Sequence, residues 1–266
     1  MEQTDKYAEA LAAFRHLLEI MDELREKCPW DRAQTFETLR NLTVEETFEL
    51  ADAIMDKDYP DMCKELGDLQ LHIVFYAKVA SELGLFNVTD VLNKLCDKLI
   101  RRHPHIYGEM KADLANEVHE NWEKIKLQTE GNRSVLGGIP SGMPALTKAN
   151  RIQDKVSGVG FDWDNKEDVW AKVQEEVGEL KAEVDAGNHD RVEEEFGDVL
   201  FSLINYARFL NVHPEDALEK TNRKFMHRFQ LLEQMVKADG RSLPDMSLAE
   251  MDEYWERAKQ IMNDEC

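Results

Sequence analysis

One acidic pattern occurs twice in this chain, with the same internal spacing and a separation of 130 residues. The two copies are Glu45-Glu46-x-x-Glu49 with Glu65-x-Gly67-Asp68, and Glu175-Glu176-x-x-Glu179 with Glu195-x-Gly197-Asp198. Because 54 of the 266 residues are acidic, one such cluster could lie on any solvated helix face. Two copies with matching spacing instead indicate that the chain contains two versions of one folding unit.

The two halves also match at further points, in the same order and with only small shifts in spacing. The matching pairs are Cys28-Pro29-Trp30-Asp31 with Phe161-Asp162-Trp163-Asp164, Tyr76-Ala77-Lys78 with Tyr206-Ala207-Arg208, and Glu120-x-Trp122-x-x-x-Lys126 with Glu253-x-Trp255-x-x-x-Lys259. A stretch rich in glycine and proline, from Gly131 to Pro144, is typical of a linker. We therefore predict a first domain at residues 1–130, a linker at 131–144 and a second domain at 145–266.

Apolar residues recur at helical spacing, as in Val199, Leu203, Tyr206 and Leu210, and no stretch shows the alternation of a convincing strand. The chain is rich in Glu, Lys, Leu and Ala and has few Gly and Pro, which favours helices. The predicted fold class is all-α, with two tandem helical-bundle domains related by internal duplication. In the second half we predict helices at 143–157, 166–187, 189–211, 214–239 and 247–263.

The formal charge of −21 argues against binding to nucleic-acid backbones or anionic membranes, both of which require basic surface. Four cysteines show no CxxC pair or zinc-site spacing and are interpreted as reduced thiols. The N-terminus is an amphipathic helix with charges throughout rather than a signal peptide, and no apolar run is long enough for a membrane span. These features predict a cytoplasmic protein.

The acidic motif places carboxylates on shared helix faces, because residues three or four apart are neighbours on a helix. Glu176 and Glu179 share one face, Glu195 and Asp198 share a face of the next helix, and two antiparallel helices would bring all four to one point. Such a cluster repels itself unless a cation neutralises it, and oxygen ligands without His or Cys select Mg²⁺, Mn²⁺ or Ca²⁺. Mg²⁺ often shares its ligand shell with phosphate oxygens, so the cluster suits a phosphorylated substrate. The alternative is a set of solvated, charge-rich helix faces.

Two details bear on that alternative. Thr43-x-x-Glu46 matches a capping box, which would give Glu46 a structural role, but the second half has Val173 at the position of Thr43 and keeps the glutamate. In both copies a glycine, Gly67 or Gly197, interrupts a predicted helix at a cost of about 1 kcal/mol relative to Ala. The repeated glycine predicts close backbone packing or the close approach of a ligand.

Positive groups for a polyphosphate are also present. Lys224 and Arg228 lie four residues apart on a predicted helix and therefore share one face, where they could bind phosphate oxygens. A surface pair that bridges to nearby glutamates remains an equal alternative. The chain has neither a GxxxxGK phosphate loop nor a GxGxxG dinucleotide loop.

Taken together, the motifs resemble the tandem-domain MazG proteins, which belong to the all-α nucleoside-triphosphate pyrophosphohydrolases. The resemblance covers nearly the whole chain and rests on EExxE, ExGD, CPWDRAQT, KLIRRHPHIYG, VGFDW and NxKFxxRF. It implies hydrolysis of nucleoside triphosphates, ATP among them, to the monophosphate and pyrophosphate. It also implies dependence on Mg²⁺, with Mn²⁺ as an alternative, and a homodimer with sites near the subunit contacts.

The resemblance also implies roles for individual residues. Glu175 would orient or deprotonate the attacking water, Lys224 and Arg228 would bind phosphate oxygens, and Trp255 and Lys259 would help to close the nucleotide pocket. The implied metal ligands are Glu176, Glu179, Glu195 and Asp198, and their first-half equivalents are Glu46, Glu49, Glu65 and Asp68.

Both acidic sets are intact, so the motif alone does not decide which half is catalytic. Three differences favour the second half. Lys172 replaces Leu42 one turn before the first glutamates, Asn205 replaces Phe75 two turns after the aspartate, and Pro104 ends the equivalent helix early in the first half. Lys172 and Asn205 are therefore predicted to bind substrate, although Asn205 would also suit a buried structural contact.

Three other functions remain to be compared. A narrow-specificity dUTP/dCTP-type pyrophosphatase would share the carboxylate helices, but a single unit would be expected. A ferritin-like di-iron bundle needs ExxH pairs, whereas both second motifs here are ExGD. A non-catalytic acidic helical module that binds a partner protein would show no metal-dependent turnover.

Overall fold

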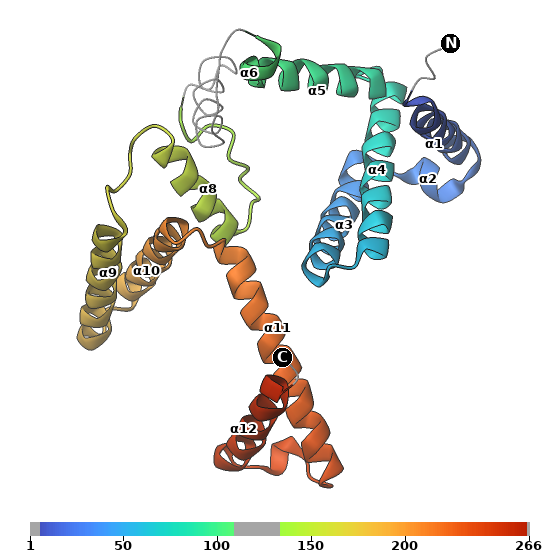
Figure 1. The fold of residues 1–266 in the computed structure, drawn as a ribbon. Coiled ribbons are helices and arrows are strands. Elements are labelled where there is room, and N and C mark those ends of the chain that lie inside the picture. Colours follow the sequence, from blue (N-terminus) through green and yellow to red (C-terminus); the bar gives the residue numbers. More distant parts are fainter. Residues whose placement is uncertain (1–5, 109–133, 265–266) are drawn as a thin grey trace. The chain divides into compact units, whose positions relative to one another are not determined.

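The computed structural model describes residues 6–108 and 134–264, and every secondary-structure element in these ranges is a helix (Figure 1). The predicted all-α class is therefore confirmed. The chain divides into two compact units, Met1–Lys111 and Ala112–Cys266, which are described separately below. The predicted linker and domain boundaries stay predictions, because residues 109–133, including Trp122 and Lys126, lie outside the described ranges. None of the described helices is long and apolar enough to cross a membrane.

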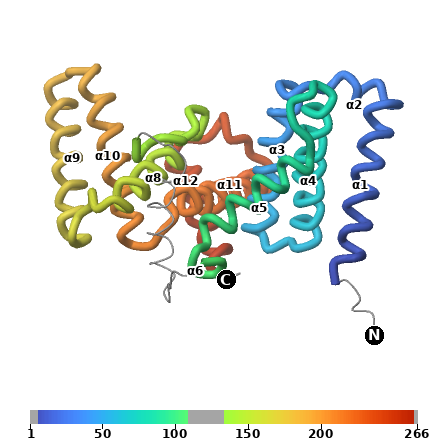
Figure 2. Tube along the Cα trace, turned by 90° about the horizontal axis from the view of Figure 1, so that it is seen from above, coloured from blue at the N-terminus to red at the C-terminus, as the bar shows by residue number. Residues whose placement is uncertain are grey.

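The first unit is built on a hairpin of two long helices, which is visible in both views (Figures 1 and 2). Thr35 begins the first of these helices through a capping box with Thr38, and the Asp58 side chain accepts a hydrogen bond at the start of the second. The helices of this unit are α1 (Ala8–Lys27), α2 (Pro29–Ala33), α3 (Phe36–Asp56), α4 (Tyr59–Glu82), α5 (Val88–Arg102) and α6 (Pro104–Tyr107).

The core of the first unit lies where α1 packs against the α3–α4 hairpin. Its buried members include Met21 from α1, Leu39 from α3, and Val74, Phe75 and Val79 from α4. Each is at most 5% exposed, so this end of the hairpin is filled with apolar side chains. That filling distinguishes the first unit from the second.

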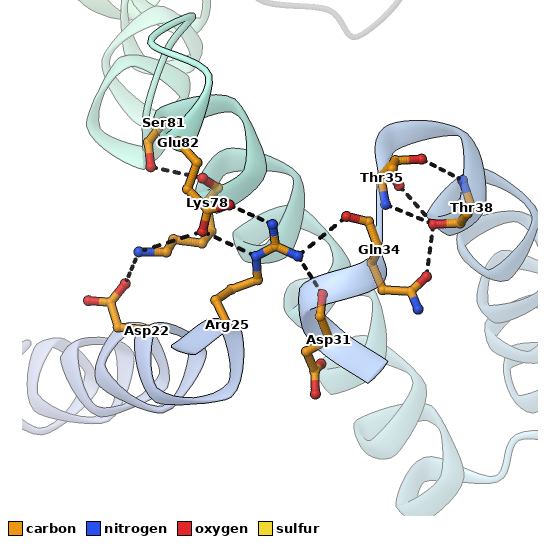
Figure 3. A network of polar contacts seen from close by, with 9 residues as sticks. All are labelled: Asp22, Arg25, Asp31, Gln34, Thr35, Thr38, Lys78, Ser81 and Glu82. Carbon is orange, nitrogen blue, oxygen red and sulfur yellow. Dashed lines mark hydrogen bonds and ion pairs between the residues drawn. The ribbon is translucent and has the colours of Figure 1, made fainter. Parts of the chain in front are cut away.

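A polar network ties α1, α2 and α4 together next to this core (Figure 3). The Arg25 guanidinium donates to both carboxylate oxygens of Glu82 and to the backbone carbonyls of Asp31 and Gln34. From α4, the Lys78 ammonium lies 2.7 Å from an Asp22 carboxylate oxygen on α1. The network thus fixes the turn that contains the Cys28-Pro29-Trp30-Asp31 motif.

The second unit repeats the hairpin and adds a second one. Gly187 closes the α9–α10 turn with a left-handed φ of 69°, which glycine adopts without strain. The helices are α8 (Ala145–Ser157), α9 (Lys166–Ala186), α10 (His189–Phe209), α11 (Pro214–Ala238), the 3₁₀ turn Leu243–Asp245 and α12 (Leu248–Asp264). All five helices predicted in this half are confirmed, with ends that shift by at most two residues. In Figure 1, α12 folds back along α11.

The capping box predicted at Thr43 is wrong. Thr43 lies inside α3, where its hydroxyl bonds the Leu39 carbonyl at 2.9 Å and the Tyr76 hydroxyl at 2.8 Å. The helix begins eight residues earlier than that motif predicts, at the cap formed by Thr35. Glu46 therefore has no capping role in this helix.

Candidate metal and substrate site

Three carboxylates of the second unit converge between α9 and α10. Glu176 and Glu179 lie on α9 and Glu195 on α10, and one oxygen of each lies within 4.8 Å of the others. Glu176 and Glu195 are buried, whereas Glu179 is exposed. Asp198, the fourth predicted ligand, is not part of this group of three. Asp198 lies one turn after Glu195 on α10 and lines a cavity together with Glu176.

The electrostatics of this cluster show uncompensated negative charge. Burial raises the pKa of Glu195, and the charges of Glu179, Asp198 and Glu176 raise it further, against the opposing effect of Arg191. The Arg191 guanidinium lies 3.1 Å from a Glu195 oxygen. Carboxylates that raise one another's pKa favour the binding of a cation, because the cation removes their mutual repulsion.

Lys172 provides a second, internal source of positive charge. Its ammonium lies 2.8 Å from Glu176 and 2.9 Å from Glu175, and both hydrogen bonds raise the pKa of the lysine. Lys172 therefore remains protonated and is held against the carboxylates. Glu175, predicted to act on water, points to Lys172 and stays half exposed, outside the group of three converging oxygens.

A cavity of about 190 Å³ opens beside the carboxylates, between α8, α9 and α10. Its walls combine three aromatic rings with polar groups. Two of the polar groups are buried amides, Gln153 and Asn205, at 7% and 8% exposure. Lys172 and Asn205, both predicted to bind substrate, line it. The full lining is Gln153, Phe161, Trp163, Val169, Lys172, Glu176, Asp198, Phe201, Ser202 and Asn205.

Two of the residues predicted to bind the nucleotide, Arg228 on α11 and Trp255 on α12, contact each other. The Arg228 guanidinium lies 4.8 Å from the centre of the Trp255 ring, and Phe225 packs on the same ring at 5.0 Å. Lys259 pairs with Glu256 on the surface of α12. None of the residues that line the carboxylate cavity belongs to α11 or α12. Within one chain, the described residues thus separate Lys224, Arg228, Trp255 and Lys259 from the metal cluster.

The first unit repeats the carboxylate cluster. One oxygen from each of Glu46, Glu49 and Glu65 lies within 4.8 Å of the others. Glu65 is 1% exposed, and its Oε2 has no hydrogen-bond partner. The Lys64 ammonium, 2.6 Å away, lowers the pKa of Glu65, whereas burial and then the charge of Asp68 raise the pKa of Glu46.

The space beside this first cluster differs from that in the second unit. Leu39, Leu42 and Phe75 take the places of Val169, Lys172 and Asn205, and Leu39 and Phe75 are buried in the core around Met21. The polar lining of the second-unit cavity is therefore replaced by packed apolar side chains.

Both clusters fit a hard divalent cation. The donor set consists of carboxylate oxygens, which Mg²⁺ prefers, and the buried, unpartnered Oε2 of Glu65 is an atom that a cation would satisfy. The close backbone packing expected at Gly67 and Gly197 is not found, because beyond the glycine's own helical turn no atom of the described residues lies within 4 Å of where a Cβ would be. Approach of a ligand to these glycines stays a prediction.

Sequence reasoning missed several residues of the second-unit cavity. Phe161 and Trp163 were recognised as part of a duplicated motif but not as cavity walls, and Gln153, in the helix before them, was not singled out. A signal was present, since Trp163 and Trp30 occupy the same place in the duplicated motif. Arg208, which bonds Asn205, appeared only in the alignment of the two halves.

Comparison with known proteins places these features in one family. A family model described as the MazG nucleotide pyrophosphohydrolase domain matches residues 34–107 and 165–231. A Thermotoga maritima protein named nucleoside triphosphate pyrophosphohydrolase/pyrophosphatase MazG is 46% identical over 94% of this chain and 97% of its own length. An Escherichia coli K12 nucleoside triphosphate pyrophosphohydrolase is 42% identical over 92% of this chain and 96% of its own length.

Among solved structures, a mazG-related protein from Thermotoga maritima is 28% identical, with a TM-score of 0.38. The match covers 42% of this chain and 98% of the solved one. The sequence comparisons, which extend over both halves, establish the family.

Proposed function

Because the chain belongs to the MazG nucleotide pyrophosphohydrolase family, we propose that it hydrolyses nucleoside triphosphates to the monophosphate and pyrophosphate. The observation that carries this proposal is the cluster of converging carboxylates in the second unit, next to a cavity with aromatic and amide walls. The cluster suits a cation that meets phosphate oxygens, and the cavity suits a planar, polar ring such as a nucleobase.

We propose Mg²⁺ as the cofactor, with Mn²⁺ as a substitute, held by Glu176, Glu179, Glu195 and Asp198. When bound, the ion would neutralise the phosphate oxygens and lower the pKa of a water molecule. Glu175 lies beside the ligands without joining them, and it would accept a proton from that water once Lys172, 2.9 Å away, turns to the substrate. Lys172, already protonated, can transfer its hydrogen bonds from the glutamates to a phosphate oxygen.

The second half is the catalytic half in this proposal. It has the cavity, the ammonium of Lys172 and the amide of Asn205 beside its carboxylates, whereas Leu42 and Phe75 occupy these places in the first half. The first-half cluster retains the capacity to hold a cation, so a regulatory or structural role is left to it.

We further propose that the active form is a homodimer in which the partner copy completes the site. Lys224, Arg228, Trp255 and Lys259 contribute nothing to the lining of the carboxylate cavity in one chain. The Arg228 Nε is buried without a hydrogen-bond partner, and the α9–α10 hairpin exposes large apolar side chains, Phe196 at 55% among them. A second copy would cover that hairpin and would bring its own α11 and α12 to the cavity.

The proposal is tested by incubating the purified chain with each NTP and dNTP, with Mg²⁺, with Mn²⁺ and with EDTA. Ion-exchange chromatography then identifies the products. We expect nucleoside monophosphate and pyrophosphate, formed only with a divalent cation. Nucleoside diphosphate and phosphate would place the cut at the other bond and contradict the proposal. Turnover unaffected by EDTA would contradict the role of the carboxylates.

A further inference from the structure

The wall of the second-unit cavity contains an amide whose orientation is fixed by hydrogen bonds from a neighbouring arginine. Asn205 lies on α10, is 8% exposed and lines both the cavity beside the carboxylates and an adjoining one of about 380 Å³. The Arg208 guanidinium donates two hydrogen bonds to the Asn205 Oδ1, from Nη2 at 2.9 Å and from Nε at 3.2 Å.

These contacts determine which end of the amide faces the cavity. A guanidinium has only donors, so the atom that it contacts must be the amide oxygen. Both hydrogen bonds come from one guanidinium and hold that oxygen toward Arg208. Among the described residues no hydrogen bond uses the Asn205 Nδ2. This nitrogen is also not one of the fully buried polar atoms that lack a partner, so it is accessible. The amino end of the amide is thus the part left to face the cavity.

Arg208 is itself held in place. Asp162, in the loop between α8 and α9, accepts from Nη1 at 2.8 Å and also from Nη2 of the same guanidinium. The neighbouring Trp163 backbone donates to Asp162 at 2.9 Å, so the loop that carries the aromatic walls is tied to the same pair. Because the ion pair is bidentate, Arg208 cannot turn away from Asn205 without losing a charged contact.

We propose that Arg208 is a positioning residue that makes Asn205 a hydrogen-bond donor only, so that the cavity favours nucleobases with a carbonyl edge over those with an amino edge. A free amide can read adenine with both ends, accepting from the amino group and donating to the ring nitrogen. Here the accepting end is occupied. Hypoxanthine, guanine, uracil and thymine carry a carbonyl oxygen at the position where adenine and cytosine carry an amino group. A donor placed against that position hydrogen-bonds the carbonyl oxygen but meets the amino group donor to donor.

The first half supplies an internal comparison. Its residue equivalent to Arg208 is Lys78, which pairs with Asp22 of α1 through a single contact (Figure 3). Three residues before Lys78 stands Phe75 rather than an amide. The ion pair thus occurs in both units, but only the second unit has an amide to orient. Gln153, the other amide of the cavity, has no comparable anchor among the described residues and can present either end.

The experiment compares inosine and adenosine triphosphates, which differ in carrying a 6-oxo or a 6-amino group on the same ring system. kcat/KM is measured for both with Mg²⁺, on the wild type, Arg208→Met, Asn205→Asp and Lys78→Met. We expect the wild type to prefer ITP by roughly ten-fold, which is the effect of one unpaired buried donor. In Arg208→Met the preference should fall toward unity through a higher KM for ITP, with kcat preserved. Lys78→Met should keep the wild-type ratio.

Asn205→Asp provides the inverse test. Its carboxylate can accept from Arg208 with one oxygen and offer the other to the cavity, so we expect the preference to reverse in favour of ATP. A ratio that stays unchanged in Arg208→Met, or a wild type that prefers ATP, would overturn the inference. If Arg208→Met fails to fold, by its thermal unfolding curve, the Asn205→Asp ratio decides.

The inference rests on the proposed function, and a binding measurement separates the two. Calorimetric titration with IMP and AMP reads the base pocket without turnover, and we expect tighter binding of IMP. Binding that favours IMP in a protein without turnover would leave base recognition standing and overturn the proposed reaction. Metal-dependent turnover with the same ITP/ATP ratio in the wild type, Arg208→Met and Asn205→Asp would support the proposed reaction and overturn the inference on base recognition.

Discussion

Glu176 and Glu195 are less than a tenth exposed, although each carries a charge that water would otherwise stabilise. Each has one cationic partner, Lys172 for Glu176 and Arg191 for Glu195. Those partners offset part of the cost of burial. Glu179 and Asp198 add further negative charge that raises the pKa of Glu195, and neither has a cationic partner among the described residues. The balance of charge at the level of single residues therefore favours a bound cation.

Glu179→Gln should abolish most of the activity while its first-half equivalent, Glu49→Gln, should not. The substitution keeps the size of the side chain but removes a charged ligand, so kcat/KM should fall on the order of 100-fold. Steady-state kinetics on both variants gives the comparison. Equal losses in the two variants would contradict the assignment of catalysis to the second half.

Thermal unfolding without metal separates this effect from damage to the fold. Removal of one of several repelling carboxylates should leave the metal-free protein as stable as the wild type or more stable. Added Mg²⁺ should stabilise Glu179→Gln less than the wild type, because the stabilisation by a bound ligand, RT ln(1 + [L]/Kd), is smaller when the affinity is lower.

At the level of elements, the two α-hairpins share the same backbone arrangement but differ in the side chains that lie beside their carboxylate clusters. The left-handed turn at Lys57 recurs at Gly187, and the acidic positions of α3–α4 recur in α9–α10. The space beside the first cluster holds Phe75 and Leu39, whereas the space beside the second cluster is a cavity. The first hairpin is closed further by Arg25, which joins it to α1 and α2 (Figure 3).

Arg25→Met should destabilise the first unit by about 2 kcal/mol, the usual effect of losing charged hydrogen bonds. Its guanidinium contacts Glu82 on α4 and two backbone carbonyls of the α2 turn, and the side chain is only 11% exposed. Urea unfolding, monitored by circular dichroism, measures the change. Because the second unit holds the proposed active site, activity at low temperature should be retained; a parallel loss of activity would show that the units are coupled.

The start of α12 should show a pH-dependent contribution to stability. Hydrogen bonds from the Ser247 backbone, from Arg241 and from the Ser247 hydroxyl lower the pKa of Glu250 to about 2. Since the folded pKa lies below the unfolded value of about 4.3, the contribution is complete above the unfolded value and is lost as the pH falls toward 2.

Glu250→Gln should therefore be less stable than the wild type at neutral pH, with a difference that narrows below about pH 4.3. The free energy of unfolding of both proteins is measured from neutral pH down to about pH 3. If the difference in unfolding free energy between the two proteins stays constant over this pH range, the charge of the Glu250 carboxylate does not stabilise the start of α12.

The elements and the acidic cluster were predictable because both depend on local spacing. All five second-half helices followed from periodicity and breakers, and i, i+3 spacing was enough to place Glu176 beside Glu179. The start of α3 could not be predicted from the sequence alone. Thr35 and Thr43 are each followed three residues later by a side chain that can complete a capping box, Thr38 and Glu46, and only Thr35 forms one in the structure. The pairing of Arg208 with Asp162 could not be predicted either, because it depends on how the α8–α9 loop returns to α10.

At the scale of the whole molecule, each hairpin has an apolar face that its own unit leaves uncovered. On α9 and α10 this face includes Val177, Phe196 and Leu203, all at least 40% exposed. Exposed apolar side chains at helical spacing on two neighbouring helices are typical of half of a four-helix bundle. A second copy of the chain supplies the other half in our proposal, and it brings the α11–α12 ligands with it.

The Phe196→Glu/Leu203→Glu double variant should be monomeric, with a mass of 30.8 kDa by light scattering, where the wild type should have twice that mass. Charges placed on this face would be buried in the dimer, which is strongly unfavourable. Because the partner copy completes the site in our proposal, the monomeric variant should also lose activity. Leu11→Glu, an equally exposed position on α1, is the control and should keep the wild-type mass. A monomeric wild type with full activity would contradict the shared site.

The most direct test of the proposed reaction is hydrolysis of ATP in ¹⁸O-labelled water with Mg²⁺, followed by mass spectrometry of both products. Attack of water at the α-phosphorus places the label in AMP and leaves pyrophosphate unlabelled, which is the result we predict. Label in pyrophosphate, with none in AMP, would show attack at the β-phosphorus and contradict the account of how the carboxylates, Glu175 and Lys172 act on the substrate.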